Sequence, residues 1–133
     1  MKLKVHHVGY AVPCIDSARM EFEALGWNVI SPVIDDLLRK VRIQFMRLND
    51  QVIELVAPLA EDSPIRKTLQ KGSGMPYHIC YEVDSLKEAE GELKALRFIV
   101  FKKPQAAPAI GGRLVEWFYS KNNGIIELVE KTK

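Results

Sequence analysis

Apolar and polar positions alternate in short stretches along this chain, a pattern that predicts β-strands. In residues 4–12, the bulky side chains of Val8, Tyr10 and Val12 fall on one face, and His7 falls on the other among small side chains. The first face suits packing beneath a helix, and the second leaves room for a ligand. The other predicted strands are residues 27–33, 41–48, 51–56, 75–83, 97–102, 113–120 and 125–130.

Two stretches have helical spacing, and each follows a histidine-containing strand. The first helix is expected to start at Asp16 or Ser17 and to run to Leu25, with Gly26 ending it. The second is expected over residues 85–96, capped by Asp84 or Ser85, and a short helix is expected over residues 64–71. Two segments are predicted without strands: residues 35–39 as loop or helical turn, and 104–112 as a loop.

The chain repeats one unit. HVGYAVP at 7–13 is echoed by HICYEVD at 78–84, at an offset of 71 residues. VIELVAP at 52–58 is echoed by IIELVEK at 125–131, at an offset of 73 residues. Each copy therefore begins with a histidine strand and ends with a glutamate strand.

The repeat predicts a single α+β domain over residues 1–133, built from two βαβββ modules. Module 1 covers residues 4–58, a linker with its helix covers 59–74, and module 2 covers 75–131. Two curved four-stranded sheets of this kind would face each other across a cleft. The expected architecture is an eight-stranded, pseudo-twofold, partly open barrel with helices on the outside.

Composition narrows the function classes. A net charge of +2 over 133 residues is too weak to favour binding of nucleic acid or of an anionic membrane. The longest apolar runs are strand-sized, and the first residues do not read as a signal peptide. Two cysteines make no disulfide framework, so a reduced, cytoplasmic location is expected.

Four residues at repeated positions form a candidate metal site: His7, Glu54, His78 and Glu127. Two neutral imidazoles and two carboxylates balance the charge of a divalent ion and leave positions for water or substrate. Taken singly, a strand histidine or glutamate is more often structural or solvated. However, each glutamate here lies between apolar residues at an equivalent place and would need partners if buried. The coincidence favours one shared site.

Other candidates carry weaker signals. Arg113 and Lys121 flank the loop and turn of module 2 and could hold a carboxylate or phosphate of a substrate, although solvated surface cations are equally compatible. Cys80 shares a strand face with His78, and a small buried thiol is the simpler interpretation. Glu82 is expected at the solvated rim.

Four stretches of the chain resemble the vicinal oxygen chelate superfamily, which includes glyoxalase I, methylmalonyl-CoA epimerase, extradiol dioxygenases and fosfomycin-resistance proteins. They are HHVGYAVPCIDSA at 6–18, VIELVAPLAEDSPIRKTLQKGSG at 52–74, YHICYEVDSL at 77–86 and YSKNNGIIELVE at 119–130. The chain looks most similar to the methylmalonyl-CoA epimerase-like branch. This resemblance implies the same four metal ligands, paired βαβββ modules around one divalent ion, and a homodimer.

The resemblance also implies a chemistry. A metal with open positions (Zn, Ni, Co, Mn or Mg) binds neighbouring oxygens of a substrate, and a carboxylate takes a proton from the adjacent carbon. Glu127, and secondarily Glu54, is the expected base. The expected enzyme is an epimerase, isomerase or lyase acting on a thioester, a hemithioacetal or another oxygen-chelating acid.

This chain departs from the epimerase pattern on one strand. Similar epimerases have a second acidic base on the third strand of the first module, but residues 41–48, VRIQFMRL, contain no acid. Gln44 is the uncharged polar candidate there for contacting substrate, and Glu116 occupies the corresponding strand of module 2, its orientation left open. Three alternatives remain: a small-molecule sequestering protein, an iron-dependent ring-cleaving dioxygenase (disfavoured by Glu54) and a duplicated interaction module.

Overall fold

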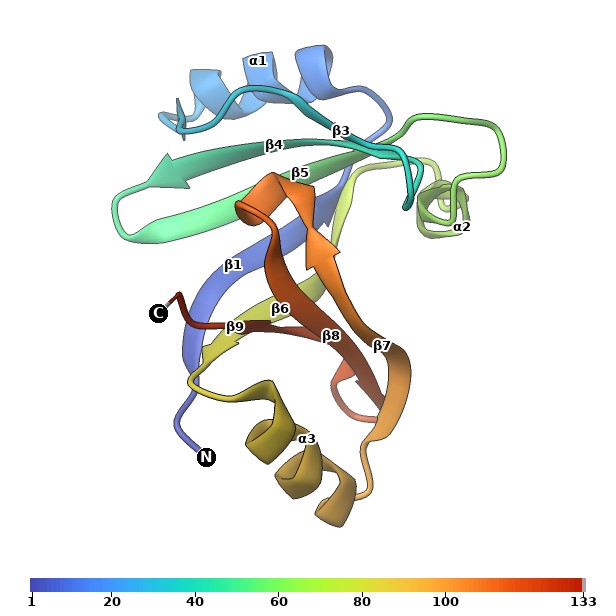
Figure 1. Ribbon diagram of the computed structural model, residues 1–133. Coiled ribbons are helices and arrows are strands. Elements are labelled where there is room, and N and C mark those ends of the chain that lie inside the picture. The colour runs from blue at the N-terminus through green and yellow to red at the C-terminus, as the bar shows by residue number, and fades with distance from the viewer. Residues whose placement is uncertain (133) are drawn as a thin grey trace. The chain divides into compact units, whose positions relative to one another are not determined.

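The computed structural model describes residues 1–132 and divides the chain into two compact units. One runs from His7 to Tyr77. The other combines Met1–His6 with the chain from His78 onward. Each unit joins helices to a sheet (Figure 1), which confirms the predicted α+β class.

The unit from His7 to Tyr77 contains a sheet with strand order β2-β4-β5-β1, and β3 pairs with β4. β1 runs parallel to β5, and β4 runs antiparallel to β5. One face of this sheet packs against α1, where Ile15 and Ala18 of the helix meet Met46 and Leu55 of the strands. The elements are β1 (Lys4–Ala11), α1 (Ile15–Ala24), β2 (Asn28–Val29), β3 (Ile34–Asp36), β4 (Val41–Leu48), β5 (Gln51–Pro58) and α2 (Ile65–Leu69).

The second unit repeats this plan with strand order β6-β9-β8-β7. Its first and last long strands, β6 and β9, are again parallel, and β8 is antiparallel to β9. Leu86, Ala89 and Leu93 of α3 pack on one face of the sheet against Phe118 and Leu128. The elements are β6 (Met75–Val83), α3 (Leu86–Ala95), β7 (Ile99–Ala107), the 3-10 turn η1 (Pro108–Ile110), β8 (Arg113–Ser120) and β9 (Gly124–Glu130).

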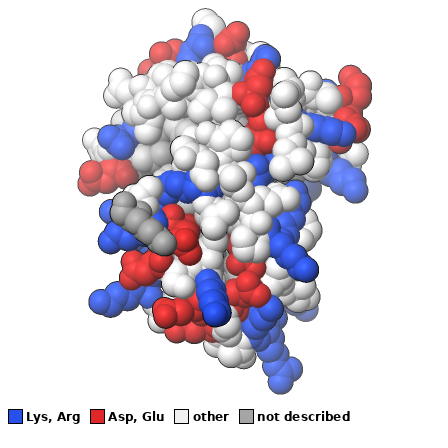
Figure 2. Space-filling view, in the orientation of Figure 1, with Lys and Arg blue, Asp and Glu red and all other residues white. Residues whose placement is uncertain are grey.

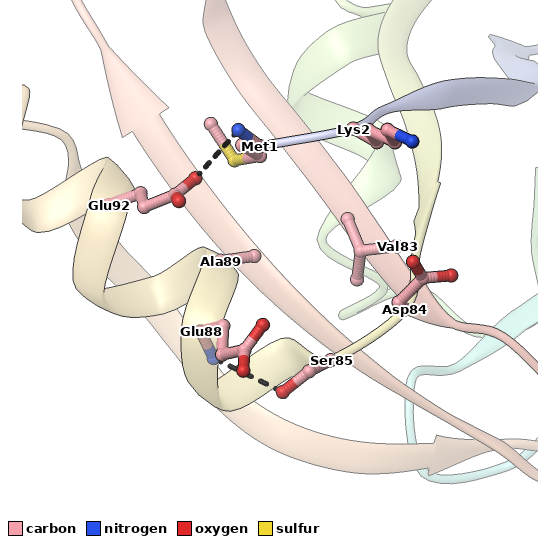
Figure 3. Close-up of a pocket in the computed structure, with 8 residues that line it drawn as sticks. All are labelled: Met1, Lys2, Val83, Asp84, Ser85, Glu88, Ala89 and Glu92. Carbon is pink, nitrogen blue, oxygen red and sulfur yellow. Dashed lines mark hydrogen bonds and ion pairs between the residues drawn. The ribbon is translucent and has the colours of Figure 1, made fainter.

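The two long helices start differently. Ser85 caps α3 as predicted, since its hydroxyl oxygen accepts a hydrogen bond of 3.2 Å from the Glu88 N–H (Figure 3). The Met1 amino group pairs with Glu92 one turn later, at 3.3 Å, beside a surface pocket of about 260 Å³ at this end of α3. The start predicted for α1 is wrong: its N-cap residue is Cys14, whose side chain makes no capping hydrogen bond.

The predicted count of eight strands is also wrong, because the described residues form nine. The additional strand, β3, lies where a loop or helical turn was expected. It pairs with the edge of β4, and its Asp35 carboxylate accepts a hydrogen bond of 2.8 Å from Arg42 of β4. Such a strand depends on a partner elsewhere in the sequence, so local alternation gives little sign of it. By contrast, β2 is shorter than predicted.

The predicted 104–112 loop is strand as far as Ala107. β7 is an edge strand, and two register shifts between Val100 and Gln105 let it carry Pro104 within the strand. Proline lacks the N–H that ladder pairing needs, so it is tolerated at edges and irregularities of this kind.

The surface view in Figure 2 shows basic and acidic side chains interspersed on the visible face. No helix within residues 1–132 is long and apolar enough to cross a membrane.

Candidate active site

The parallel pairing of β1 with β5 brings His7 and Glu54 together. Gly9 is the direct partner of Glu54, so His7, two residues earlier, is the diagonal neighbour on the same face. Because Gly9 has no side chain, nothing from that position separates the imidazole from the carboxylate. His7 Nε2 lies 3.4 Å from Glu54 Oε1, and both residues are buried.

The parallel pairing of β6 with β9 repeats this arrangement in the other unit. The small Cys80 is the direct partner of Glu127, and His78 is again the diagonal neighbour. His78 Nε2 lies 3.4 Å from Glu127 Oε1, the same separation as in the first unit, and both residues are buried. The sequence repeat is therefore also a repeat of side-chain geometry.

Each pair has an aromatic neighbour that sequence reasoning missed. Phe45 on β4 is directly opposite Glu54, and its ring makes an edge contact with His7, at 5.3 Å between centroids and an angle of 77°. Trp117 on β8 is directly opposite Glu127 and meets His78 in the same way, at 4.8 Å and 73°. A signal existed in the sequence: the aromatic residue precedes its glutamate by nine positions in one copy and ten in the other.

The donor chemistry of each pair suits a divalent cation. A buried carboxylate and an imidazole nitrogen are hard and borderline ligands of the kind that bind zinc and other divalent first-row ions. A buried carboxylate also needs compensation of its charge. The residues present thus fit the ion that the sequence resemblance implies.

Comparison with known proteins decides the family. Residues 6–115 match the model of the glyoxalase/bleomycin resistance protein/dioxygenase superfamily. The chain belongs to this superfamily. It is 33% identical over 129 residues to the ethylmalonyl-CoA/methylmalonyl-CoA epimerase of Cereibacter sphaeroides, covering 94% of this chain and 96% of that protein. It is 30% identical over 131 residues to the mitochondrial methylmalonyl-CoA epimerase of Bos taurus, covering 96% and 74%.

Solved structures share the fold. A hypothetical protein from Bacillus halodurans superposes with a TM-score of 0.85 at 28% identity, covering 100% of this chain and 97% of that one. The Streptomyces coelicolor methylmalonyl-CoA epimerase in complex with 2-nitronate-propionyl-CoA gives a TM-score of 0.86 at 20% identity, covering 99% and 100%. The predicted membership of the superfamily, and the likeness to its epimerases, are confirmed.

Within this superfamily member, Gln44 does not lie on the face of Glu54. Gln44 pairs with Leu55, whereas its neighbour Phe45 pairs with Glu54, so Gln44 points to the opposite face of the sheet. It is buried there, and its amide nitrogen donates to the Ser31 carbonyl oxygen at 3.2 Å. The structure therefore places Gln44 in the packing of its module, on the face opposite to that of Glu54, and its contact with substrate stays a prediction.

Glu116 is turned away from Glu127 in the same manner. It pairs with Leu128, so it lies on the face that α3 covers, and it is 1% exposed. Burial raises the pKa of the Glu116 carboxyl to about 7, and the nearby Glu90 carboxylate on α3 adds to the rise. The orientation that the sequence left open is thus resolved: this acid does not share a face with Glu127.

Arg113 lies on the same face of β8 as Trp117, but neighbours already engage it. Its guanidinium donates to the Glu82 carboxylate at 2.5 Å and to the Glu130 carbonyl oxygen at 3.1 Å. The hydrogen bond from Arg113, helped by its charge, holds the pKa of the Glu82 carboxyl below its usual range. Arg113 is therefore no solvated surface cation. Lys121 is exposed on the turn between β8 and β9, apart from this network.

Proposed function

We propose that this protein is a divalent-metal-dependent epimerase or isomerase that removes a proton from the carbon beside the carbonyl of an acyl thioester. The observation that carries the proposal is the duplicated His–Glu pair, buried and at 3.4 Å in each module. Relatives named as ethylmalonyl-CoA and methylmalonyl-CoA epimerases support the substrate class. The Streptomyces coelicolor structure, which holds an acyl-CoA, supports it further.

In this proposal His7, Glu54, His78 and Glu127 would hold the ion. When bound, the ion would supply a Lewis acid that stabilises the negative charge left when the proton is removed. The remaining chemistry belongs to the side chains of this chain.

Glu127 is the proposed base. Its carboxylate accepts the proton from the carbon next to the carbonyl. Trp117 packs against the His78 ring and so fixes the histidine nearest to Glu127. On β4 and β8, no acid shares a face with Glu54 or Glu127, because Glu116 faces α3. Return of the proton to the opposite face, which epimerisation requires, therefore falls to Glu54, whereas return to the next carbon, as in an isomerase, falls to Glu127 itself.

The test is deuterium uptake at the acidic carbon of methylmalonyl-CoA in D2O, followed by NMR or mass spectrometry. We expect Glu127→Gln to lower the exchange rate by about 10²–10⁴-fold, the usual contribution of a positioned base. Glu116→Gln is the matched control, since it makes the same change on the same sheet but on the opposite face. Full exchange activity in Glu127→Gln would contradict the assignment of the base.

Metal analysis separates this function from the alternatives. We expect purified protein to hold a divalent ion in stoichiometric amount. Tight binding of an acyl-CoA by metal-free protein, with no exchange in metal-loaded protein, would instead favour a sequestering protein. Oxygen consumption with a catechol would favour a ring-cleaving dioxygenase.

A further inference from the structure

The two His–Glu pairs are alike, but their aromatic neighbours differ by one polar group. Phe45 offers only a ring, whereas Trp117 also carries an indole N–H. Within residues 1–132, Trp117 Nε1 is buried and has no hydrogen-bond partner. Buried indole N–H groups usually find an acceptor, because leaving one unpaired carries the full desolvation penalty.

The Trp117 indole N–H lies close to the proposed base, Glu127. Trp117 is directly opposite Glu127 in the β8–β9 register, so the two side chains leave the sheet on the same face. Its ring contacts the His78 ring, the partner of Glu127. The indole thus lies beside His78 and Glu127, the proposed base. It lies on the sheet face opposite to the one that α3 covers, so core packing against the helix does not explain its position.

The other tryptophan of the chain provides the contrast. Trp27 packs against the hydrophobic core between α1 and the sheet. Its ring makes an edge contact with that of Phe22, at 5.9 Å between centroids. Arg113, a second donor on the face of Trp117, already donates to Glu82 and to the Glu130 carbonyl oxygen. Trp117 combines two properties: it lies beside the His–Glu pair, and its hydrogen-bonding capacity is unused.

We propose that the Trp117 indole N–H donates a hydrogen bond to a carboxylate oxygen of the substrate and so sets which end of the substrate lies next to Glu127. This inference rests on the proposed function and adds to it a residue that positions the substrate. A charged acceptor suits a buried donor better than a neutral carbonyl, because charge-assisted hydrogen bonds are the stronger kind. Phe45 cannot make this bond, so the two halves of a duplicated site become distinguishable to the substrate.

The direct test is NMR of protein labelled with nitrogen-15. The chain has two tryptophans, so two indole N–H signals are expected, and Trp117→Phe assigns them. We expect titration with malonate to move the Trp117 indole proton downfield and to leave the Trp27 signal in place. Malonamide, which has the same shape without the charge, should cause a smaller shift.

Binding measurements supply the second readout. Trp117→Phe keeps an aromatic ring against His78 and removes the donor. By calorimetry, it should weaken binding of malonate and of methylmalonyl-CoA by about 10-fold to 100-fold, the range for a hydrogen bond to a charged group. Trp27→Phe is the matched control and should leave both affinities unchanged. The malonate titration of the unaltered protein needs no variant, so it remains decisive if Trp117→Phe folds poorly.

The outcomes separate this inference from the proposed function. An unmoved Trp117 signal at saturating malonate, no malonate binding at all, or unchanged affinity in Trp117→Phe would each overturn the inference. If methylmalonyl-CoA exchanges deuterium while any of these holds, the inference fails alone. If the Trp117 signal moves with malonate but methylmalonyl-CoA shows no exchange, the proposed function fails and the carboxylate contact stands.

Discussion

The two modules agree at the ligand pairs and differ one residue away from them. His7 with Glu54 and His78 with Glu127 have the same 3.4 Å separation, and each histidine meets an aromatic ring edge-on. The residues that precede those rings, Gln44 and Glu116, also occupy equivalent places, and both are buried facing away from the pairs.

The difference lies on the sheet faces that point away from the His–Glu pairs. The faces that carry the pairs have the same donor set, which suits the proposed metal site. On the opposite faces, Gln44 donates to Ser31, whereas Glu116 is a buried carboxyl with a raised pKa beneath α3.

The strongest test of the comparison removes one histidine at a time. If the pairs are equivalent ligands, His7→Ala and His78→Ala should each lower metal affinity by more than about 100-fold, since loss of even a supporting residue outside the ligand set costs 10- to 100-fold. Chelator competition on metal-loaded protein measures this. His6→Ala is the control, because His6 is the adjacent histidine and should leave the affinity close to that of the unaltered protein. A large loss in one of the two variants and none in the other would break the equivalence.

The next effect concerns the sheet faces that point away from the pairs. The folded protein holds the Glu116 proton up to about pH 7, whereas the unfolded chain releases it near 4.5. Stability should therefore fall as pH rises between these values, at about 1.4 kcal/mol per pH unit and by at most about 3.5 kcal/mol.

Glu116→Gln makes module 2 resemble module 1 at this position and should remove that loss. Urea unfolding at pH 5 and pH 8 measures it: the variant should be more stable than the unaltered protein at pH 8, with the difference shrinking at pH 5. Equal stability of the two proteins at pH 8 would show that the carboxyl is not penalised by burial.

The smallest expected effect lies at the helix starts. Ser85→Ala removes a capping hydrogen bond and should lower the free energy of unfolding by about 1 kcal/mol. Cys14→Ser supplies a capping hydroxyl that α1 lacks and should raise it by about 0.5–1 kcal/mol. Thermal unfolding of the two variants compares the modules directly. A loss of stability in Cys14→Ser would indicate that the geometry around Cys14 cannot accept a cap.

The features that the sequence predicted are those that show as a repeated motif or as alternation of apolar and polar residues. The α+β class is confirmed. The two modules and the four ligands stay predictions, which rest on the recurrence of each residue at an equivalent place in the second copy. The sequence could not place Glu116, since its face depends on how β8 pairs with β9 across a turn one residue longer than that between β4 and β5.

Edge structure was missed for a related reason. β3 exists through pairing with β4, and the length of β7 depends on register shifts around Pro104. In both cases the partner is the next strand along the chain, and it is the pairing register that decides where the strand begins and ends. Pattern reasoning over a short window describes a strand's own residues but not its partner.

The parallel ladders have a further consequence for assembly. Each His–Glu pair joins the first long strand of its module to the last, so the chain between them must close into a loop before the two ligands meet. Contacts of this high sequence separation are slow to form. The helices and hairpins should therefore form first. During refolding, uptake of a divalent ion should begin only when the β1–β5 and β6–β9 ladders are complete.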